Sequence, residues 1–131
     1  MSVVAFDHCN LSAHRADLER LRAFYVDVVG LREGTRPEIG RSGYWLYAGD
    51  VAVLHLIEAR PGEQRDADVT GTFNHVAFRC SDYDIMLDRL QARGIVMRVV
   101  DDRAQRLRQL FFRDPLGNGV ELVFPSGAGP Q

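Results

Sequence analysis

The chain repeats itself, and this repeat restricts it to a duplicated architecture. Residues 6–8, Phe-Asp-His, recur 67 residues later as residues 73–75, Phe-Asn-His. Each copy opens a short apolar run with the composition of a β-strand, over 8–11 in the first half and 75–78 in the second. A repeat of this length predicts two similar supersecondary modules, each built from about half of the chain.

In the first half, the opening strand leads into a helix. Apolar residues at helical spacing predict that helix, and Gly30 is its expected C-cap. Three strands are predicted to follow, over 31–36, 43–48 and 51–58.

The second half follows the same order. Asp82 is the expected N-cap of its helix, and Gly94 is expected to end it. Three further strands are predicted over 95–100, 108–113 and 119–124, and the Asp-Pro-Leu-Gly-Asn segment at 114–118 is a turn between the last two. Each half therefore has the order βαβββ, and the fold class is α+β. We expect one domain over 1–131, with module one at 1–58, a linker at 59–71 and module two at 72–125.

The last strands of the two halves also correspond. Residues 53–57, Val-Leu-His-Leu-Ile, match residues 119–123, Gly-Val-Glu-Leu-Val, at an offset of 66. His55 is thus the counterpart of Glu121, as His8 is of His75.

Composition excludes several classes of protein. The net charge of −2, with acids and bases interspersed, gives no basic face for nucleic acid. No apolar run is long enough to span a membrane, and residues 1–8 lack the features of a signal peptide, so we expect a cytoplasmic protein. The chain has no lysine, which excludes Schiff-base chemistry. Cys9 and Cys80 lie in apolar runs and are expected to be buried free thiols.

Four corresponding residues suggest a metal site. His8, His55, His75 and Glu121 all lie within apolar strands, and an unpaired carboxylate at Glu121 would cost several kcal/mol. Imidazole and carboxylate together favour Fe, Mn, Ni, Co or Zn over calcium. Two histidines and one carboxylate leave open coordination positions, at which a metal can polarise an oxygen. The alternative is a structural histidine cluster that forms an ion pair with Glu121.

Strand alternation predicts which side chains surround such a site. Asn10 shares the face of His8, whereas Cys9 points to the other side. By the same rule, Trp45 and Tyr47 share one face, as do Gln109 and Phe111. We expect Asn10, Trp45, Tyr47, Gln109 and Phe111 to bind substrate.

Three segments resemble the vicinal oxygen chelate superfamily, which includes glyoxalase I, extradiol dioxygenases and bleomycin-resistance proteins. They are residues 24–31, residues 73–78 (Phe-Asn-His-Val-Ala-Phe) and residues 111–122. The resemblance implies paired βαβββ modules that form a cupped mixed sheet around one divalent metal, usually in a homodimer. It assigns three ligands to His8, His75 and Glu121. Related families place a glutamate or glutamine at His55, so a histidine here departs from the pattern.

The resemblance also implies a reaction class. Chelation of neighbouring oxygens stabilises an enolate, and a nearby base completes a lyase or isomerase reaction. Glu121 and His55 are the candidates for that base. The native metal and the small-molecule substrate stay open, as does whether His55 is a ligand or an acid/base residue. It is also open whether one chain or a dimer builds the site.

Two other functions remain. An Fe(II) extradiol dioxygenase usually carries a tyrosine ten residues before the last glutamate. This chain has Phe111 there, and we expect Tyr47, at the matching place in the first half, to supply the phenol in that case. Alternatively, Trp45, Tyr47 and Phe111 would line the groove of a metal-free, drug-sequestering resistance protein.

Overall fold

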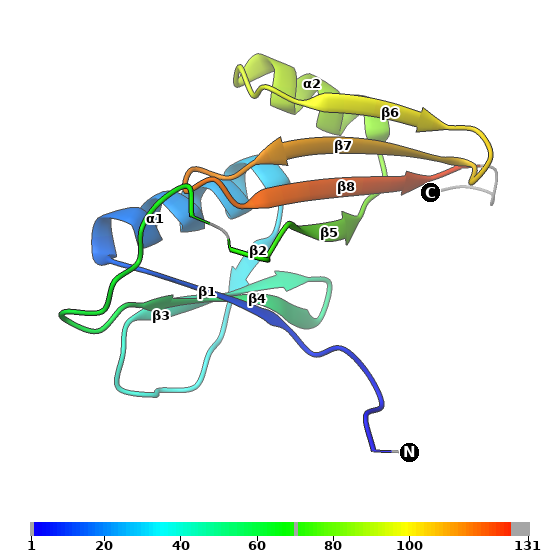
Figure 1. The fold of residues 1–131 in the computed structure, drawn as a ribbon. Coiled ribbons are helices and arrows are strands. Elements are labelled where there is room, and N and C mark those ends of the chain that lie inside the picture. Colours follow the sequence, from blue (N-terminus) through cyan, green and yellow to red (C-terminus); the bar gives the residue numbers. More distant parts are fainter. Residues whose placement is uncertain (1, 70, 127–131) are drawn as a thin grey trace. The chain divides into compact units, whose positions relative to one another are not determined.

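A computed structural model describes residues 2–69 and 71–126 (Figure 1). Residues 1 and 127–131 of the predicted domain, and residue 70 of the predicted linker, lie outside the described residues. The chain divides into two compact units, Met1–Asp66 and Ala67–Gln131. Within the described part, no helix has both the length and the apolar character needed to cross a bilayer.

The first unit is a four-stranded mixed sheet with one helix (Figure 1). The strand order is β1-β4-β3-β2; β1 runs parallel to β4 and the other neighbours are antiparallel. Its elements are β1 (Cys9–Ala13), α1 (Arg15–Phe24), the π-helical turn η1 (Tyr25–Val29), β2 (Arg32–Gly34), β3 (Gly43–Ala48) and β4 (Val51–Glu58).

The second unit repeats this arrangement with the order β5-β8-β7-β6, again with a parallel first pair. Its elements are β5 (His75–Arg79), α2 (Tyr83–Ala92), β6 (Arg98–Asp102), β7 (Leu107–Arg113) and β8 (Gly119–Pro125). The predicted α+β class with two βαβββ modules is confirmed, in the form of two four-stranded mixed sheets.

Glycines end both helices, as predicted. Gly30 has a φ of 98° and follows η1, where its N–H donates to the Tyr25 carbonyl over 3.1 Å. After α2, the N–H of Gly94 donates to Gln91 and that of Ile95 donates to Leu90, which is a Schellman ending. This ending occupies the backbone just after Gly94, so β6 begins at Arg98 and the predicted start at residue 95 is wrong.

Asp82 occupies the predicted N-cap position of α2, but its side chain does not cap the helix. Asp82 directly precedes the helix, yet its side chain makes no capping hydrogen bond and its φ is 59°. Instead its carboxylate accepts a hydrogen bond from the Ser81 hydroxyl at 3.2 Å.

The turn between β7 and β8 is held by one buried carboxylate. Asp114 is 5% exposed, and its Oδ1 accepts hydrogen bonds from the backbone N–H groups of Leu116 and Asn118 at 2.9 and 3.0 Å. Its Oδ2 accepts a third from the Asn118 amide. Because all three bonds are local, the turn fixes how β7 enters β8.

Neither cysteine is fully buried, which corrects the expectation of buried thiols. Cys9 and Cys80 are both free and partly exposed. Burial raises the pKa of the Cys80 thiol to about 11 and also raises the pKa of Cys9. Both are therefore thiols at neutral pH, which makes them poor nucleophiles.

The core of each unit lies on one face of its sheet. In the first unit, α1 packs on β4 and β1, and Leu54 and Leu56 are almost fully buried. In the second, Leu110, Val120 and Leu122 are buried in the same way. Since strand side chains alternate, His55 and Glu121 are directed to the opposite faces of these sheets.

We expect Leu54→Ala to lower the free energy of unfolding by about 2–5 kcal/mol, because it leaves a cavity on the core face of β4. Val51→Ala, on the same strand but with Val51 56% exposed, should cost less than about 1 kcal/mol. Chemical denaturation followed by circular dichroism measures both. Equal losses would show that the core face is assigned incorrectly.

Candidate metal centre

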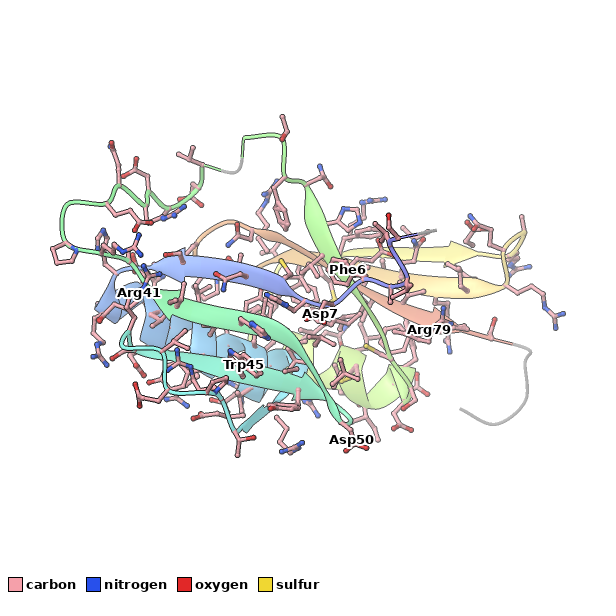
Figure 2. All side chains as sticks on the ribbon, turned by 90° about the horizontal axis from the view of Figure 1, so that it is seen from below. Phe6, Asp7, Arg41, Trp45, Asp50 and Arg79 are labelled. Carbon is pink, nitrogen blue, oxygen red and sulfur yellow. The ribbon has the colours of Figure 1, made fainter. Side chains whose placement is uncertain are left out.

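In the first unit, the rings of His8 and Trp45 both stack on His55. The His8 and His55 ring centroids are 3.7 Å apart with an interplanar angle of 14°. Trp45 stacks on His55 with a centroid distance of 4.0 Å and an angle of 11°. Figure 2 labels Trp45 on β3 and Asp7 just before β1. The strand register explains the Trp45 contact, since Trp45 and His55 are direct cross-strand partners.

The environment of His55 favours its neutral form. Its side chain is 8% exposed, and burial together with the nearby His8 lowers the pKa of His55. Its Nε2 lies 3.2 Å from the Ala52 carbonyl oxygen, which can only accept, so Nε2 carries the hydrogen in this arrangement. The lone pair available for a metal or for a proton is then on Nδ1.

In the second unit, His75 contacts Glu121. The Nε2 of His75 lies 3.1 Å from Oε1 of Glu121, and the Glu121 side chain is only 10% exposed. Its other oxygen, Oε2, accepts a hydrogen bond from the Gln109 amide at 2.9 Å. The buried carboxylate expected from the sequence thus has an imidazole on one oxygen and an amide on the other.

Both nitrogens of His75 face oxygens that only accept. Nδ1 lies 2.7 Å from Oδ1 of Asn74, and Nε2 faces Glu121. A neutral imidazole has one N–H, so one of the two contacts needs a further hydrogen or a cation. Nε2 of His75 and Oε1 of Glu121, 3.1 Å apart, are close enough that both could hold one cation.

Asp7 and Asn74 were not predicted as site residues. Oδ1 of Asp7 lies 2.7 Å from Nδ1 of His8, as Oδ1 of Asn74 does from Nδ1 of His75. In each case the acceptor holds the hydrogen on Nδ1 and leaves the Nε2 lone pair free for a metal. Their place before each histidine of the repeat was the signal that could have identified them.

The strand registers of the two units correspond residue by residue at this point. Asn10 is the direct partner of His55 in β4, and Ala77 is the direct partner of Glu121 in β8. Asn10 therefore shares the face of His55, whereas Cys9 pairs with Leu54 on the core side.

The sequence predicts Tyr47 as the first-half counterpart of Phe111, and this prediction is wrong. Phe111 pairs with Glu121, and Trp45 pairs with His55, so the counterpart of Phe111 is Trp45. The Tyr47 hydroxyl instead donates to the Thr35 carbonyl oxygen at 2.6 Å.

Among residues 2–69 and 71–126, no group of three or more histidine, cysteine, aspartate or glutamate side chains gathers in a metal-binding arrangement. The structure places His8 against His55 in one unit and His75 against Glu121 in the other.

Most of the chain matches a known family model. The family model of the Glyoxalase/Bleomycin resistance protein/Dioxygenase superfamily matches residues 5–122. No curated protein matches the chain in sequence.

Solved structures share the fold. A lactoylglutathione lyase from Agrobacterium tumefaciens is 23% identical, with a TM-score of 0.67 over 95% of this chain and 96% of that one. The antibiotic-binding protein TnmS3 from Streptomyces sp. CB03234 is 24% identical, with a TM-score of 0.64 over 96% and 99%. The fosfomycin resistance protein FosX from Listeria monocytogenes, solved with Mn(II) and sulfate, is 18% identical, with a TM-score of 0.66 over 95% of each chain. At these identities the likeness shows the fold alone.

We expect Asp7→Ala and Asn74→Ala each to release the Nδ1 hydrogen of the following histidine. Nitrogen-15 NMR of the imidazoles in metal-free protein at alkaline pH should show a shift from the Nδ1–H tautomer towards the Nε2–H tautomer. Asp7→Asn is the matched control, because it reproduces in the first half the amide that the second half already uses, and it should keep the Nδ1–H form. Unchanged tautomers in both alanine variants would contradict the role of these anchors.

Proposed function

Since the chain belongs to the Glyoxalase/Bleomycin resistance protein/Dioxygenase superfamily, we propose that it is a divalent-metal-dependent enzyme of the lyase or isomerase type. Its substrate is a small molecule with two neighbouring oxygen atoms. The observation that carries the proposal is the contact of His75 with Glu121, in which both imidazole nitrogens face acceptor oxygens. His75 and Glu121 would hold a divalent cation at this contact, and the cation would supply the positive charge that the facing oxygens accept.

We assign the ligands to His8, His55, His75 and Glu121. The donor set fits a transition metal such as Fe, Mn, Ni, Co or Zn, because it combines imidazole nitrogens with a carboxylate. His8 and His75 would bind through Nε2, because their Nδ1 atoms are held by Asp7 and Asn74. His55 would bind through Nδ1, because its Nε2 donates to Ala52.

A bound metal would polarise two neighbouring substrate oxygens and so acidify the adjacent C–H bond. Glu121 is the residue that we propose to accept the proton from this carbon. Gln109 holds one of its oxygens, which fixes the plane of the carboxylate. His55, whose lowered pKa keeps it neutral, is the alternative proton acceptor in place of its ligand role, because its single lone pair on Nδ1 serves only one of the two.

Five side chains are proposed to contact the substrate. Gln109 and Phe111 share the Glu121 face of the second sheet, and Asn10 and Trp45 share the His55 face of the first. Tyr47 stands two residues beyond Trp45 on β3. The proposed enzyme acts as a homodimer.

Two features of the structure disfavour the dioxygenase alternative. Phe111 has no phenol to offer, and the Tyr47 hydroxyl is bound to a backbone carbonyl in the first unit. The stack of Trp45 on His55 favours the other alternative, binding of a flat drug, and one structural relative is an antibiotic-binding protein. That function needs no metal, so metal analysis separates it from the enzyme.

We predict about one metal per chain in protein purified anaerobically with metal supplied. His8→Ala or Glu121→Ala should lower the metal content at least tenfold, because each removes a ligand. His14→Ala is the matched control; His14 contacts the Glu63 carbonyl instead, and its removal should leave the metal content unchanged. Elemental analysis measures the ratio, and a metal content near zero in the parent protein would refute the proposal.

In cobalt-substituted protein, His55→Ala should change the visible spectrum; an unchanged spectrum would remove His55 from the ligands.

We predict metal-dependent turnover of a hemithioacetal or another vicinal-oxygen substrate without oxygen consumption. Glu121→Gln should lower kcat by about 10²–10⁴-fold, because the amide cannot accept the proton. The assay compares a substrate panel with oxygen uptake on catechols after reconstitution with Fe(II). Oxygen uptake would establish the dioxygenase instead, and tight antibiotic binding by metal-free protein without any turnover would establish sequestration.

A further inference from the structure

The second unit contains a cavity beside His75. Its volume is about 690 Å³, within the range of pockets that bind small molecules. The lining includes His75, Arg98, Phe111, Arg113 and Gly119. All five belong to β5, β6, β7 and β8, so the pocket lies entirely within one unit.

The strand registers arrange these residues in two rows across the sheet. In one row, Arg98 pairs with Phe111, and Phe111 pairs with Glu121. In the next row, Arg113 pairs with Gly119, and Gly119 pairs with His75. Each row has an arginine on one side and a proposed ligand two strands away. Because neighbouring strands lie about 4.8 Å apart, about 10 Å separates the backbones at the two ends of each row.

Gly119, the residue between Arg113 and His75 in the second row, has no side chain. A Cβ atom added to Gly119 would lie 2.9 Å from the Cβ of His75 and 2.3 Å from the Asn74 carbonyl oxygen. Only glycine allows β5 and β8 to approach this closely, and it leaves the floor of the pocket without a side chain.

Both arginines have donors to spare. The Cζ atom of Arg98 lies over the Phe111 ring, 4.3 Å from its centroid, and among the described residues its guanidinium N–H groups have no hydrogen-bond acceptor. Arg113 donates from one nitrogen, Nη1, to the Gly117 carbonyl oxygen at 2.8 Å. A guanidinium has five N–H donors, so most remain available for an anion.

The pocket has positive charge without a compensating acid. None of the described residues that line it is an aspartate or glutamate, and neither arginine forms an ion pair with a described carboxylate. Glu121 is the proposed ligand on the same face; it does not line the pocket, and Gln109 and His75 occupy its oxygens.

We propose that this pocket holds an oxyanion of the substrate, and that the substrate class is a small organic carboxylate or phosphonate with an apolar segment. Arg98 and Arg113 bind the anionic group, Phe111 contacts the apolar segment, and the oxygen donors extend towards His75 and Glu121. This inference rests on the proposed function for that last orientation, whereas anion binding by the two arginines is independent of it.

Titration of the purified, metal-free full chain tests the anion site. The probes are benzoate, phenylphosphonate and the neutral benzyl alcohol, followed by calorimetry and by NMR of backbone amides. We expect saturable binding of at least one anion and at least tenfold weaker binding of the alcohol. The tighter of the two anions identifies the source of the oxyanion as carboxylate or phosphonate.

The variants separate a built site from general charge. Arg98→Gln and Arg113→Gln should each weaken the anion about tenfold, and the double variant about 100-fold. Arg103→Gln removes the same charge from the β6–β7 turn outside the pocket and should change the affinity less than twofold. The inference is overturned if no anion binds, if the alcohol binds equally well, or if Arg103→Gln weakens binding as much as the pocket variants do.

Failure of the proposed function gives a different result. Glu121→Ala should abolish metal binding yet leave the anion affinity of the metal-free protein within twofold. Anion binding that depends on the two arginines, in a protein that binds no metal, would support this pocket and reject the metal enzyme.

Discussion

The alternation of side chains across a strand is the constraint on which the candidate site depends. Leu54 and Leu56 occupy the core face of β4, and Val120 and Leu122 that of β8. Each pair flanks one polar residue, which the pleat directs to the opposite face. The apolar burial that stabilises each unit therefore also positions His55 and Glu121. A polar site on that face requires no change in the core packing, because the two faces are chemically separate.

The same constraint explains why the sequence predicts most of this fold. β3 and β4 have the predicted bounds, because each begins and ends at turn residues and shows a clear apolar pattern. The start of β6 was misplaced because a Schellman ending uses backbone beyond the glycine, and no side chain in the sequence marks that. Asp82 was assigned the right position and the wrong role, since a capping side chain must also adopt a rotamer that the sequence does not specify.

For the candidate site, the sequence predicts the positions of the four residues but not the side chains that orient them. The repeat identified His8, His55, His75 and Glu121 as equivalent positions, and the registers give the same correspondence between His55 and Glu121. The side-chain anchors of the imidazoles were missed, because an exposed aspartate or asparagine before a strand resembles ordinary turn chemistry. Which nitrogen carries the hydrogen depends on distances below 3 Å, and these follow from rotamers and not from a pattern of residue types.

The two halves of the repeat differ in one irregularity of strand pairing. The β3–β4 ladder shifts its register between Leu46 and Tyr47, whereas β7 and β8 pair without a break from Leu107 to Arg113. A bulge absorbs one extra residue where it occurs, so the pairing of Trp45 with His55 is unaffected by the length of the hairpin beyond it. We therefore expect insertions or deletions at the tip of this hairpin to leave the pairing of Trp45 with His55 unchanged. A one-residue slip of β4 in its register would, by contrast, turn the imidazole inward and a leucine outward.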